Sequence, residues 1–273
     1  MHIAIFAKTY PRPTLAETFA AAAADGLHHL HFNFSCCPGL SALPETIPDD
    51  YVLEIQQTLR TQPVQLIGVS GTYNLLHPDQ RRRAHGRRAV AAIAERCPAL
   101  SIPLVSLCTG THDPDDKWRH HPQNATPESF AEVLREFEHL IPIAEQYGLL
   151  LGVEPETANV INGPERAREL LDALQSDRLK IILDPANLFE MAPPNEVRER
   201  IVRAVELLGP DIAVAHAKDR TAAGRVVPAG RGAVDFGFLI ERLRGVGYGG
   251  PLVLHGLSET EVPEAVVHLR AEQ

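Results

Sequence analysis

Two carboxylates and two imidazoles in the second half of the chain could together bind a divalent cation. Glu154, Asp184, His216 and His255 each follow directly after a short apolar run. Such oxygen and nitrogen donors suit manganese, zinc, cobalt or iron, whereas imidazole disfavours magnesium. Any one of these residues alone would more often be a loop residue or a helix cap. Four at matching positions favour a site for one divalent metal ion, since carboxylates gathered without a cation would repel one another.

Other polar residues at the ends of apolar runs could contact a substrate. The candidates are Lys8, Asn33, His77, His112, Asn187, Lys218, Asp219 and Arg231. Glu156 and Asn187 follow two of the ligand candidates closely, although both could simply cap helices. Arg231 lies between two glycines, so an anion could approach it, and a solvated turn is equally consistent. The pair His120-His121 lies among Asp, Pro and Asn residues, which is more typical of a solvated loop.

These residues need a scaffold that brings the ends of several strands together. Eight short apolar runs alternate with segments long enough for helices. The predicted strands are His2–Phe6, His28–Phe34, Val64–Val69, Leu104–Cys108, Leu149–Val153, Lys180–Leu183, Ile212–Ala215 and Leu252–Leu254. No linker or change of composition divides residues 1–273, so we expect one domain of the α/β class, a single (β/α)8 TIM barrel. A doubly wound open sheet is the alternative.

Local signals mark the ends of several helices. Thr14 and Glu17 have the spacing of a capping box, and Gly26 can end the helix that follows. Thr126-Pro127 predicts a helix start, with apolar residues at helical spacing up to Gly148. Pro164 and Asn195 open two further helices. Gly245–Gly250 fits GxGxxG but follows a helix and precedes a strand, so we interpret it as a turn and not as a dinucleotide-binding loop.

Composition excludes several classes of protein. Asp and Glu outnumber Lys and Arg by 35 to 26. This acidic balance argues against sequence-independent binding of nucleic acid, which needs positive charge to neutralise phosphates. The apolar runs are far shorter than the roughly 20 residues of a membrane-spanning helix. Met1–Phe6 has the pattern of a strand and not that of a signal peptide, so a cytoplasmic location is expected. Cys36, Cys37, Cys97 and Cys108 lack metal-binding spacing and are interpreted as reduced thiols.

Four segments resemble the signature of the xylose isomerase-like TIM-barrel superfamily: Leu151–Glu156, Leu183–Leu188, His216–Asp219 and Gly230–Phe236. That group contains sugar and sugar phosphate isomerases and epimerases, inosose dehydratase and AP-site endonucleases. In its ketose epimerases Glu, Asp, His and Glu hold the metal, so the resemblance implies that Glu154, Asp184 and His216 are ligands. His255 stands where those epimerases have the second Glu, and Glu259 is a candidate to replace that carboxylate. Dimers and tetramers are common in the group, which implies a homodimer or homotetramer.

The leading interpretation is a metal-dependent isomerase or epimerase of a small sugar, sugar phosphate or related polyhydroxy carbonyl compound, acting through an enediolate. Glu154 is the first candidate for the general base, with Glu156 or Glu259 in reserve, and Lys218 or Arg231 would orient an anionic end of the substrate. A dehydratase of the inosose type is the second interpretation, because elimination can proceed with one base. A non-catalytic sugar-binding barrel is the third. The endonuclease reading is disfavoured, because the early strands lack the additional histidines of a trinuclear zinc site.

Overall fold

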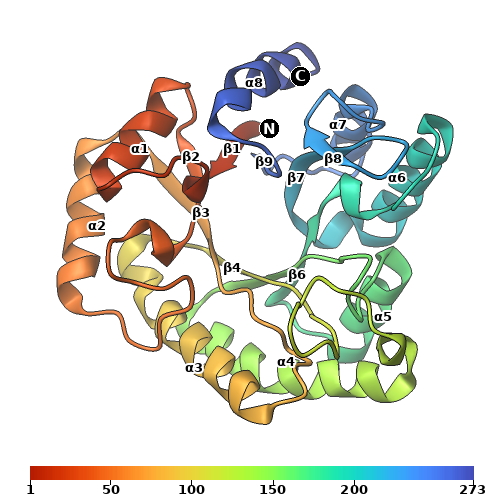
Figure 1. Cartoon of the computed structure of the whole chain (residues 1–273), viewed down its shortest axis with the longest axis horizontal. Coiled ribbons are helices and arrows are strands. Elements are labelled where there is room, and N and C mark those ends of the chain that lie inside the picture. Colours follow the sequence, from red (N-terminus) through yellow and green to blue (C-terminus); the bar gives the residue numbers. More distant parts are fainter.

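Eight parallel strands close into a barrel in the computed structural model, which describes all 273 residues, and eight helices surround it (Figure 1). The barrel strands are β1 (His2–Phe6), β2 (His29–Phe32), β3 (Gln65–Ser70), β4 (Leu104–Leu107), β5 (Leu150–Val153), β6 (Leu179–Leu183), β7 (Ile212–Arg220) and β9 (Pro251–Leu254). The helices are α1 (Leu15–Ala24), α2 (Asp49–Thr61), α3 (Gln80–Arg96), α4 (Pro127–Tyr147), α5 (Pro164–Leu174), α6 (Pro194–Leu208), α7 (Phe236–Gly245) and α8 (Val262–Ala271). The predicted (β/α)8 barrel is confirmed, and the open sheet is excluded.

The barrel closes through strands far apart in the sequence. β9 lies between β1 and β7, with Ile3 paired to Leu252 and His216 to Val253. A direct pairing of β6 with β7 completes the ring. All of these pairings are parallel, so the carboxyl ends of the eight strands meet at one end of the barrel.

Alternate residues of each strand divide the core in two. Ala4 and Phe6 of β1 belong to a small cluster inside the barrel, whereas Ile5 belongs to the large cluster between strands and helices. His31 of β2 is also inside and fully buried. Gly68 of β3 makes room for it, because a Cβ atom at this position would lie 3.2 Å from the His31 ring. The absence of a side chain at Gly68 therefore makes space for the His31 ring inside the barrel.

The helix ends follow the predicted signals closely. Thr14 and Glu17 form the capping box of α1, and Gly148 ends α4 with a φ of 69°. α5 begins at Pro164, whereas α6 begins at Pro194, one residue before the predicted Asn195. The Gly245–Gly250 segment connects α7 to β9, which confirms that it is a turn.

One hairpin was not predicted. β7 continues five residues beyond the predicted end at Ala215 and pairs antiparallel with β8 (Val226–Pro228), with Lys218 opposite Pro228. The polar run from Lys218 to Arg220 lacks the apolar pattern of a strand, yet the hairpin buries Lys218 and Asp219. Long-range pairing therefore outweighs local pattern at the carboxyl end of β7.

Two further expectations concern helices and thiols. None of the helices combines the length and apolar character needed to cross a membrane.

All four cysteines are free, and three of them, Cys37, Cys97 and Cys108, are buried. Burial raises the pKa of Cys97 to about 12, which leaves its thiol protonated and unreactive at neutral pH.

Candidate metal centre and cavity

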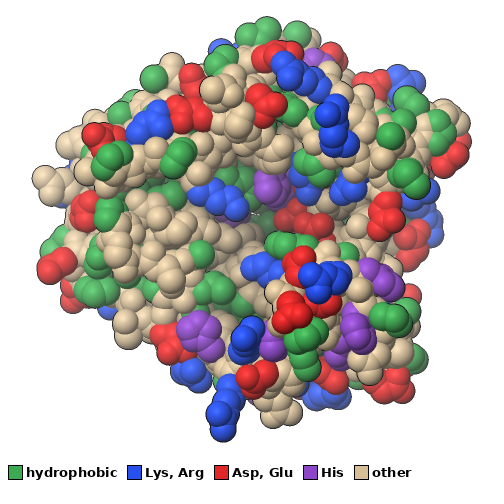
Figure 2. Space-filling view, viewed as in Figure 1, with side chains coloured by type: hydrophobic (Ala, Val, Ile, Leu, Met, Phe, Trp, Pro, Cys, Tyr) green, Lys and Arg blue, Asp and Glu red, His purple; other side chains and the backbone are tan.

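A cavity of about 770 Å³ opens at the carboxyl ends of the barrel strands. Figure 2 shows the hollow near the middle of this face, with basic, acidic and histidine side chains gathered around it. Its walls include residues from the ends of five strands: Phe6, Ser106, Glu154, His216 and His255. The cavity is large enough for a small metabolite, and ligand pockets of other proteins have similar volumes.

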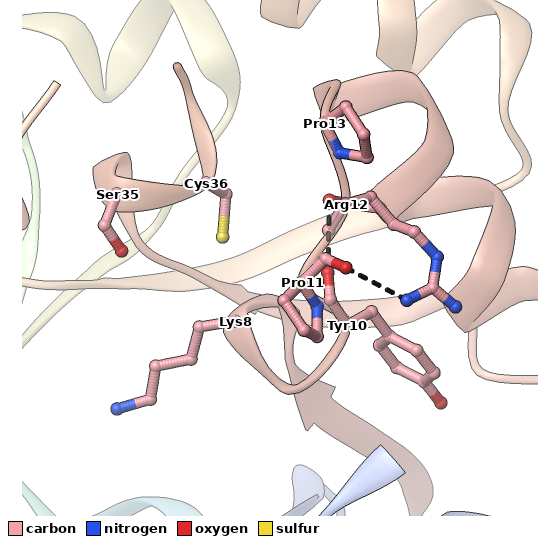
Figure 3. Close-up of a pocket in the computed structure, with 8 residues that line it drawn as sticks. Lys8, Tyr10, Pro11, Arg12, Pro13, Ser35 and Cys36 are labelled. Atoms are coloured by element: carbon pink, nitrogen blue, oxygen red, sulfur yellow. Dashed lines mark hydrogen bonds between the residues drawn. The ribbon is translucent and has the colours of Figure 1, made fainter. Parts of the chain in front are cut away.

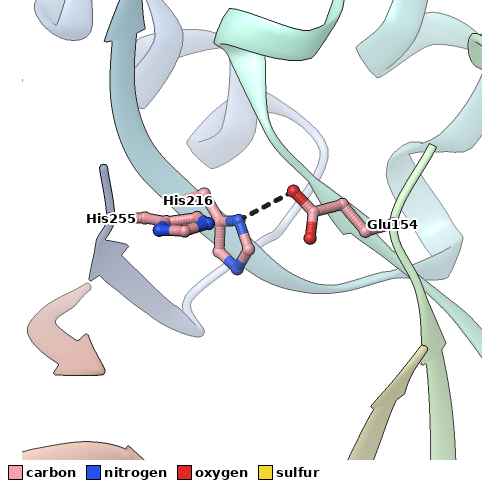
Figure 4. A group of neighbouring side chains, drawn as sticks. All are labelled: Glu154, His216 and His255. Carbon is pink, nitrogen blue, oxygen red and sulfur yellow. Dashed lines mark ion pairs between the residues drawn. The ribbon is translucent and has the colours of Figure 1, made fainter. Parts of the chain in front are cut away.

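Three side chains at the floor of the cavity form a group that could hold a metal ion. Glu154 follows β5, His216 lies in β7 and His255 follows β9, and their ligand atoms lie within 4.8 Å of one another (Figure 4). Nδ1 of His216 lies 3.3 Å from Oε1 of Glu154. The same nitrogen lies 3.3 Å from Oδ2 of Asp184, which follows β6. The carboxylates of two predicted ligands, Glu154 and Asp184, thus flank the Nδ1 atom of a third, His216.

Asp184 is fully buried and has a second cationic partner. Its Oδ1 accepts a hydrogen bond from the backbone N–H of Ala186, and its Oδ2 lies 2.9 Å from Nζ of Lys218. Burial alone would raise the pKa of Asp184, but Lys218 and His216 outweigh it and hold that pKa well below its usual value. The carboxylate is therefore ionised at all ordinary pH values.

Asn187 connects the two carboxylates through Lys218. Nζ of Lys218 donates to Oδ1 of Asn187 at 2.7 Å, and Nδ2 of Asn187 donates to Oε1 of Glu154 at 2.9 Å. Asn187 is buried and belongs to the short turn that Pro185 begins directly after β6. These hydrogen bonds hold the Glu154 carboxylate in one orientation. A carboxylate without such partners at a cavity wall would be free to rotate.

Charges in the cavity push the pKa values of its groups apart. Burial and the charge of Glu154 raise the pKa of Glu156 to about 8. Burial would lower the pKa of His216, but the carboxylates of Glu154 and Asp184 raise it to about 9. Burial and the charge of His216 lower the pKa of His255 well below its ordinary value, so that ring is neutral. A protonated Glu156 thus lies close to an ionised Asp184 at neutral pH.

The backbone defines which nitrogen of His255 carries the proton. Nδ1 of His255 accepts a hydrogen bond of 2.8 Å from the N–H of Gly256. Because an accepting nitrogen has no proton, the neutral ring carries its proton on Nε2. Gly256 has a φ of 70°, and a Cβ atom there would lie 3.0 Å from Cγ of Lys218, so glycine suits this turn on both counts.

The remaining predicted substrate contacts divide into two groups. Lys8, Asn33 and Lys218 line the cavity. His77 and His112 do not: Nε2 of His77 lies 2.9 Å from the carbonyl oxygen of Pro114, and Nε2 of His112 lies 2.7 Å from Oγ of Ser129. His77 instead connects two loops, and His112 connects its loop to the first turn of α4.

Three other predicted residues lie away from the cavity. Asp219 is fully buried, and its carboxylate accepts backbone N–H groups from Arg220, Gly230, Gly232 and Val234, which shapes the loop after β8. Arg231 pairs with Glu264 of α8. Glu259 pairs with Arg12, in the loop that precedes α1. The structure does not bring these three to the group around His216.

Sequence reasoning missed one wall of the cavity. Lys117, Trp118, Arg119 and His120, from the loop between β4 and α4, line it. Their composition is typical of a solvated loop, and His120 is indeed exposed, yet the loop lies over the barrel mouth. The only available signal was its position, because loops after barrel strands form the catalytic face of this fold.

Comparisons with known proteins agree with this architecture. The family model described as xylose isomerase-like TIM barrel matches residues 19–271. A crystal structure of the 3-keto-D-glucoside 4-epimerase YcjR from E. coli has a TM-score of 0.78 and 16% identity, and the match covers 99% of both chains. The IOLI protein with a bound zinc atom has a TM-score of 0.73 and 17% identity, covering 100% of this chain and 97% of that one.

A third solved structure carries a different activity. The probable 3-DHS dehydratase AsbF from Bacillus anthracis has a TM-score of 0.77 and 13% identity, with 99% of both chains covered. A search of curated protein sequences found no match. At these identities the solved structures bear on the fold alone, since one barrel fold hosts many reactions.

Proposed function

Because the chain belongs to the xylose isomerase-like TIM-barrel family, we propose that it is a metal-dependent isomerase or epimerase of a small polyhydroxy carbonyl compound. One observation carries the proposal: Glu154, Asp184 and His216 converge at the floor of a cavity of metabolite size. Structural neighbours that act on sugars, and one described with bound zinc, support it.

The donor atoms fit a divalent cation. Ligands held about 2.0 to 2.2 Å from one ion lie roughly 3 Å apart, and the 3.3 Å distances from Nδ1 of His216 to the two carboxylates match this spacing. Glu154, Asp184 and His216 would hold the ion, and their mixed donors favour manganese, zinc or cobalt over magnesium. When bound, the cation would supply a Lewis acid for the charge that develops on a substrate carbonyl oxygen.

Glu154 and Glu156 would share the proton transfers. Glu154, oriented by Asn187, takes a proton from the carbon next to the carbonyl group, and the C–H electron pair moves to form the enediolate. Glu156 lines the same cavity two residues beyond Glu154, so in its protonated form it can return a proton to carbon. One carboxylate therefore begins as base and the other as acid.

His255 would donate a hydrogen bond from Nε2. Its ring extends from the end of β9 toward His216 and Glu154 (Figure 4). A ligand nitrogen needs a free lone pair, but the Gly256 N–H occupies Nδ1 and leaves the proton on Nε2. The hydrogen bond from Gly256 therefore favours His255 as a donor to a substrate oxygen. The sequence predicts instead that His255 is the fourth metal ligand.

The test is exchange of substrate hydrogen with solvent. Ketoses and ketose phosphates are incubated with the protein in deuterated water and followed by proton NMR. Glu154→Gln is expected to abolish exchange, whereas Glu190→Gln, a cavity-lining control outside the cluster, retains it. An active Glu154→Gln variant would remove Glu154 from the mechanism.

A dehydratase is the second candidate, and His255 is the observation that favours it. The neutral N–H of His255 can hydrogen-bond a departing hydroxyl group, and the proton that Glu154 removes from carbon leaves with that hydroxyl as water. The same NMR experiment separates the two reactions. Elimination produces a new unsaturated or carbonyl product and loses water, whereas isomerisation conserves the composition of the substrate.

A further inference from the structure

The cavity wall is basic although the chain is acidic. Five of its 21 lining residues are Lys or Arg and three are Glu, whereas in the whole chain Asp and Glu outnumber Lys and Arg. The five basic residues are Lys8, Lys117, Arg119, Lys218 and Arg220. In Figure 2 basic side chains gather around the hollow. Such a reversal concentrates positive potential where a ligand would bind.

Two of these cations already have carboxylate partners. Nζ of Lys218 contacts Asp184, and Arg119 pairs with Asp113 at 3.1 Å. The charges of Lys218 and Arg119 are thus already balanced by internal carboxylates, which weakens their attraction for an external anion. Lys8, Lys117 and Arg220 have no carboxylate partner, so their charges are uncompensated. Arg220 is held by the carbonyl oxygens of Ala186 and Gly224, which positions it without neutralising it.

Lys8 lies beside the Phe6 ring, which also packs against His255. Its Nζ is 5.4 Å from the centre of the Phe6 ring, and that ring is 4.8 Å from the ring of His255. Lys8 also borders a second cavity of about 530 Å³ that contains Tyr10 and Arg12. Figure 3 shows its side chain extending away from both of those residues. The ammonium of Lys8 makes no hydrogen bond or ion pair with the protein, which leaves all three of its N–H groups for a ligand.

Lys117 contributes a second ammonium from another wall. Its Nζ donates to the backbone carbonyl of Thr72 at 3.0 Å and lies 5.4 Å from the Trp118 ring. The carbonyl restrains the side chain and uses one of three donors, so two are left. A restrained ammonium loses less rotamer entropy on binding an anion than a free one does.

We infer that the substrate carries an anionic group, a phosphate or a carboxylate, and that Lys8 and Lys117 receive it while the carbonyl end lies at the Glu154 side. This inference rests on the proposed function, because it assigns the substrate class of the same cavity. It also moves the anion contact away from Lys218, which Asp184 engages, and from Arg231, which pairs with Glu264.

Calorimetric binding of matched ligands tests the inference without relying on turnover. The probes are D-fructose, D-fructose 6-phosphate and D-glucuronate, titrated into the native protein and into Glu154→Gln. At least one charged probe is expected to bind tenfold or more tightly than fructose. The phosphate and carboxylate arms then show which anion the site prefers.

Matched variants locate the contact. Lys8→Met and Lys117→Met are each expected to weaken the charged probe about tenfold and to leave fructose binding unchanged, whereas Arg242→Met, which removes a cation on α7 outside the cavity, changes neither. Equal affinity of the native protein for charged and neutral probes would overturn the inference. Failure of both charged probes to bind would also overturn it, and so would native affinity for the charged probe in both lysine variants. If the protein binds the charged probes selectively but exchanges no substrate hydrogen with solvent, the proposed reaction is overturned and the anion site is not.

Discussion

Nζ of Lys218 lies 2.9 Å from Oδ2 of Asp184, the same oxygen that faces His216. The ammonium of Lys218 therefore occupies the carboxylate oxygen that the proposed metal ion would also need. Because both residues are buried, their charges are weakly screened by solvent. This geometry makes Lys218 a competitor for any metal ion held at Asp184 as well as its electrostatic partner in the metal-free protein.

Removing that ammonium should change metal affinity and stability in opposite directions. Lys218→Met is expected to bind manganese or zinc at least tenfold more tightly by calorimetry, and to lose about 3 kcal/mol of stability in chelator, since breaking a buried pair leaves an uncompensated charge. Lys180→Met, which breaks a half-buried pair with Asp211, is the control and should leave metal affinity unchanged. Weaker metal binding by Lys218→Met would contradict the competition.

Metal content should distinguish ligands from the His255 donor. Protein purified without chelator or affinity-column metal is expected to contain about one equivalent of a divalent metal by elemental analysis. Glu154→Ala and His216→Ala should lose it, whereas His255→Gln should keep it, because Nε2 of His255 carries a proton. Loss of metal from His255→Gln would make His255 the fourth ligand, as the sequence predicts.

The Asp219 carboxylate should be structural. It accepts four backbone N–H groups, so Asp219→Ala leaves four donors unpaired, the buried N–H of Val234 among them, and is expected to cost about 3 kcal/mol in denaturant unfolding. Gly232→Ala should be destabilising for a related reason, because its Cβ would lie 2.1 Å from Oδ1 of Asp219. Binding of the sugar probes by folded Asp219→Ala should be close to that of the native protein, and a selective loss of binding would return Asp219 to the substrate site.

His31 should make the metal-free protein less stable in mild acid. Burial lowers the pKa of His31 to about 3, whereas the unfolded chain has the ordinary value near 6.5. Between these pH values only the unfolded state binds the proton, so this contribution to stability is complete above pH 6.5 and is lost as the pH falls. His31→Gln should reduce the loss between pH 6.5 and 5 by about 1.6 kcal/mol, measured by urea unfolding in chelator. His139→Gln, an exposed change on α4, should follow the native profile, and an unchanged profile in His31→Gln would contradict the assignment.

The barrel could be predicted because its signals are local. Each strand is a short apolar run, and helix starts such as Thr14 and Thr126 carry their own caps. The eight barrel strands accordingly lie where they were expected. The β7–β8 hairpin could not be predicted, because its pairing of Lys218 with Pro228 depends on a polar strand and a three-residue partner.

The cavity was harder to predict than the fold. Glu154, Asp184 and His216 follow apolar runs, so topology alone brings them together. Contacts between distant segments decide the rest: Glu259 lies 247 positions from its partner Arg12. The glycines around Arg231 are typical of an anion site, but in the folded chain Arg231 pairs with Glu264 of α8. The pKa of Glu156 likewise depends on burial, which no spacing reveals.

The position of β9 between β7 and β1 has a consequence for the order of assembly. Glu154, Asp184 and His216 belong to three neighbouring strands, so a chain that has formed only β5, β6 and β7 already has the group that would capture a cation. His255 and Lys8 join it only when β9 docks between β7 and β1 and closes the barrel. The proposed metal ligands therefore lie on neighbouring strands whether or not the ring is closed, whereas the proposed anion contact at Lys8 meets them only in the closed ring.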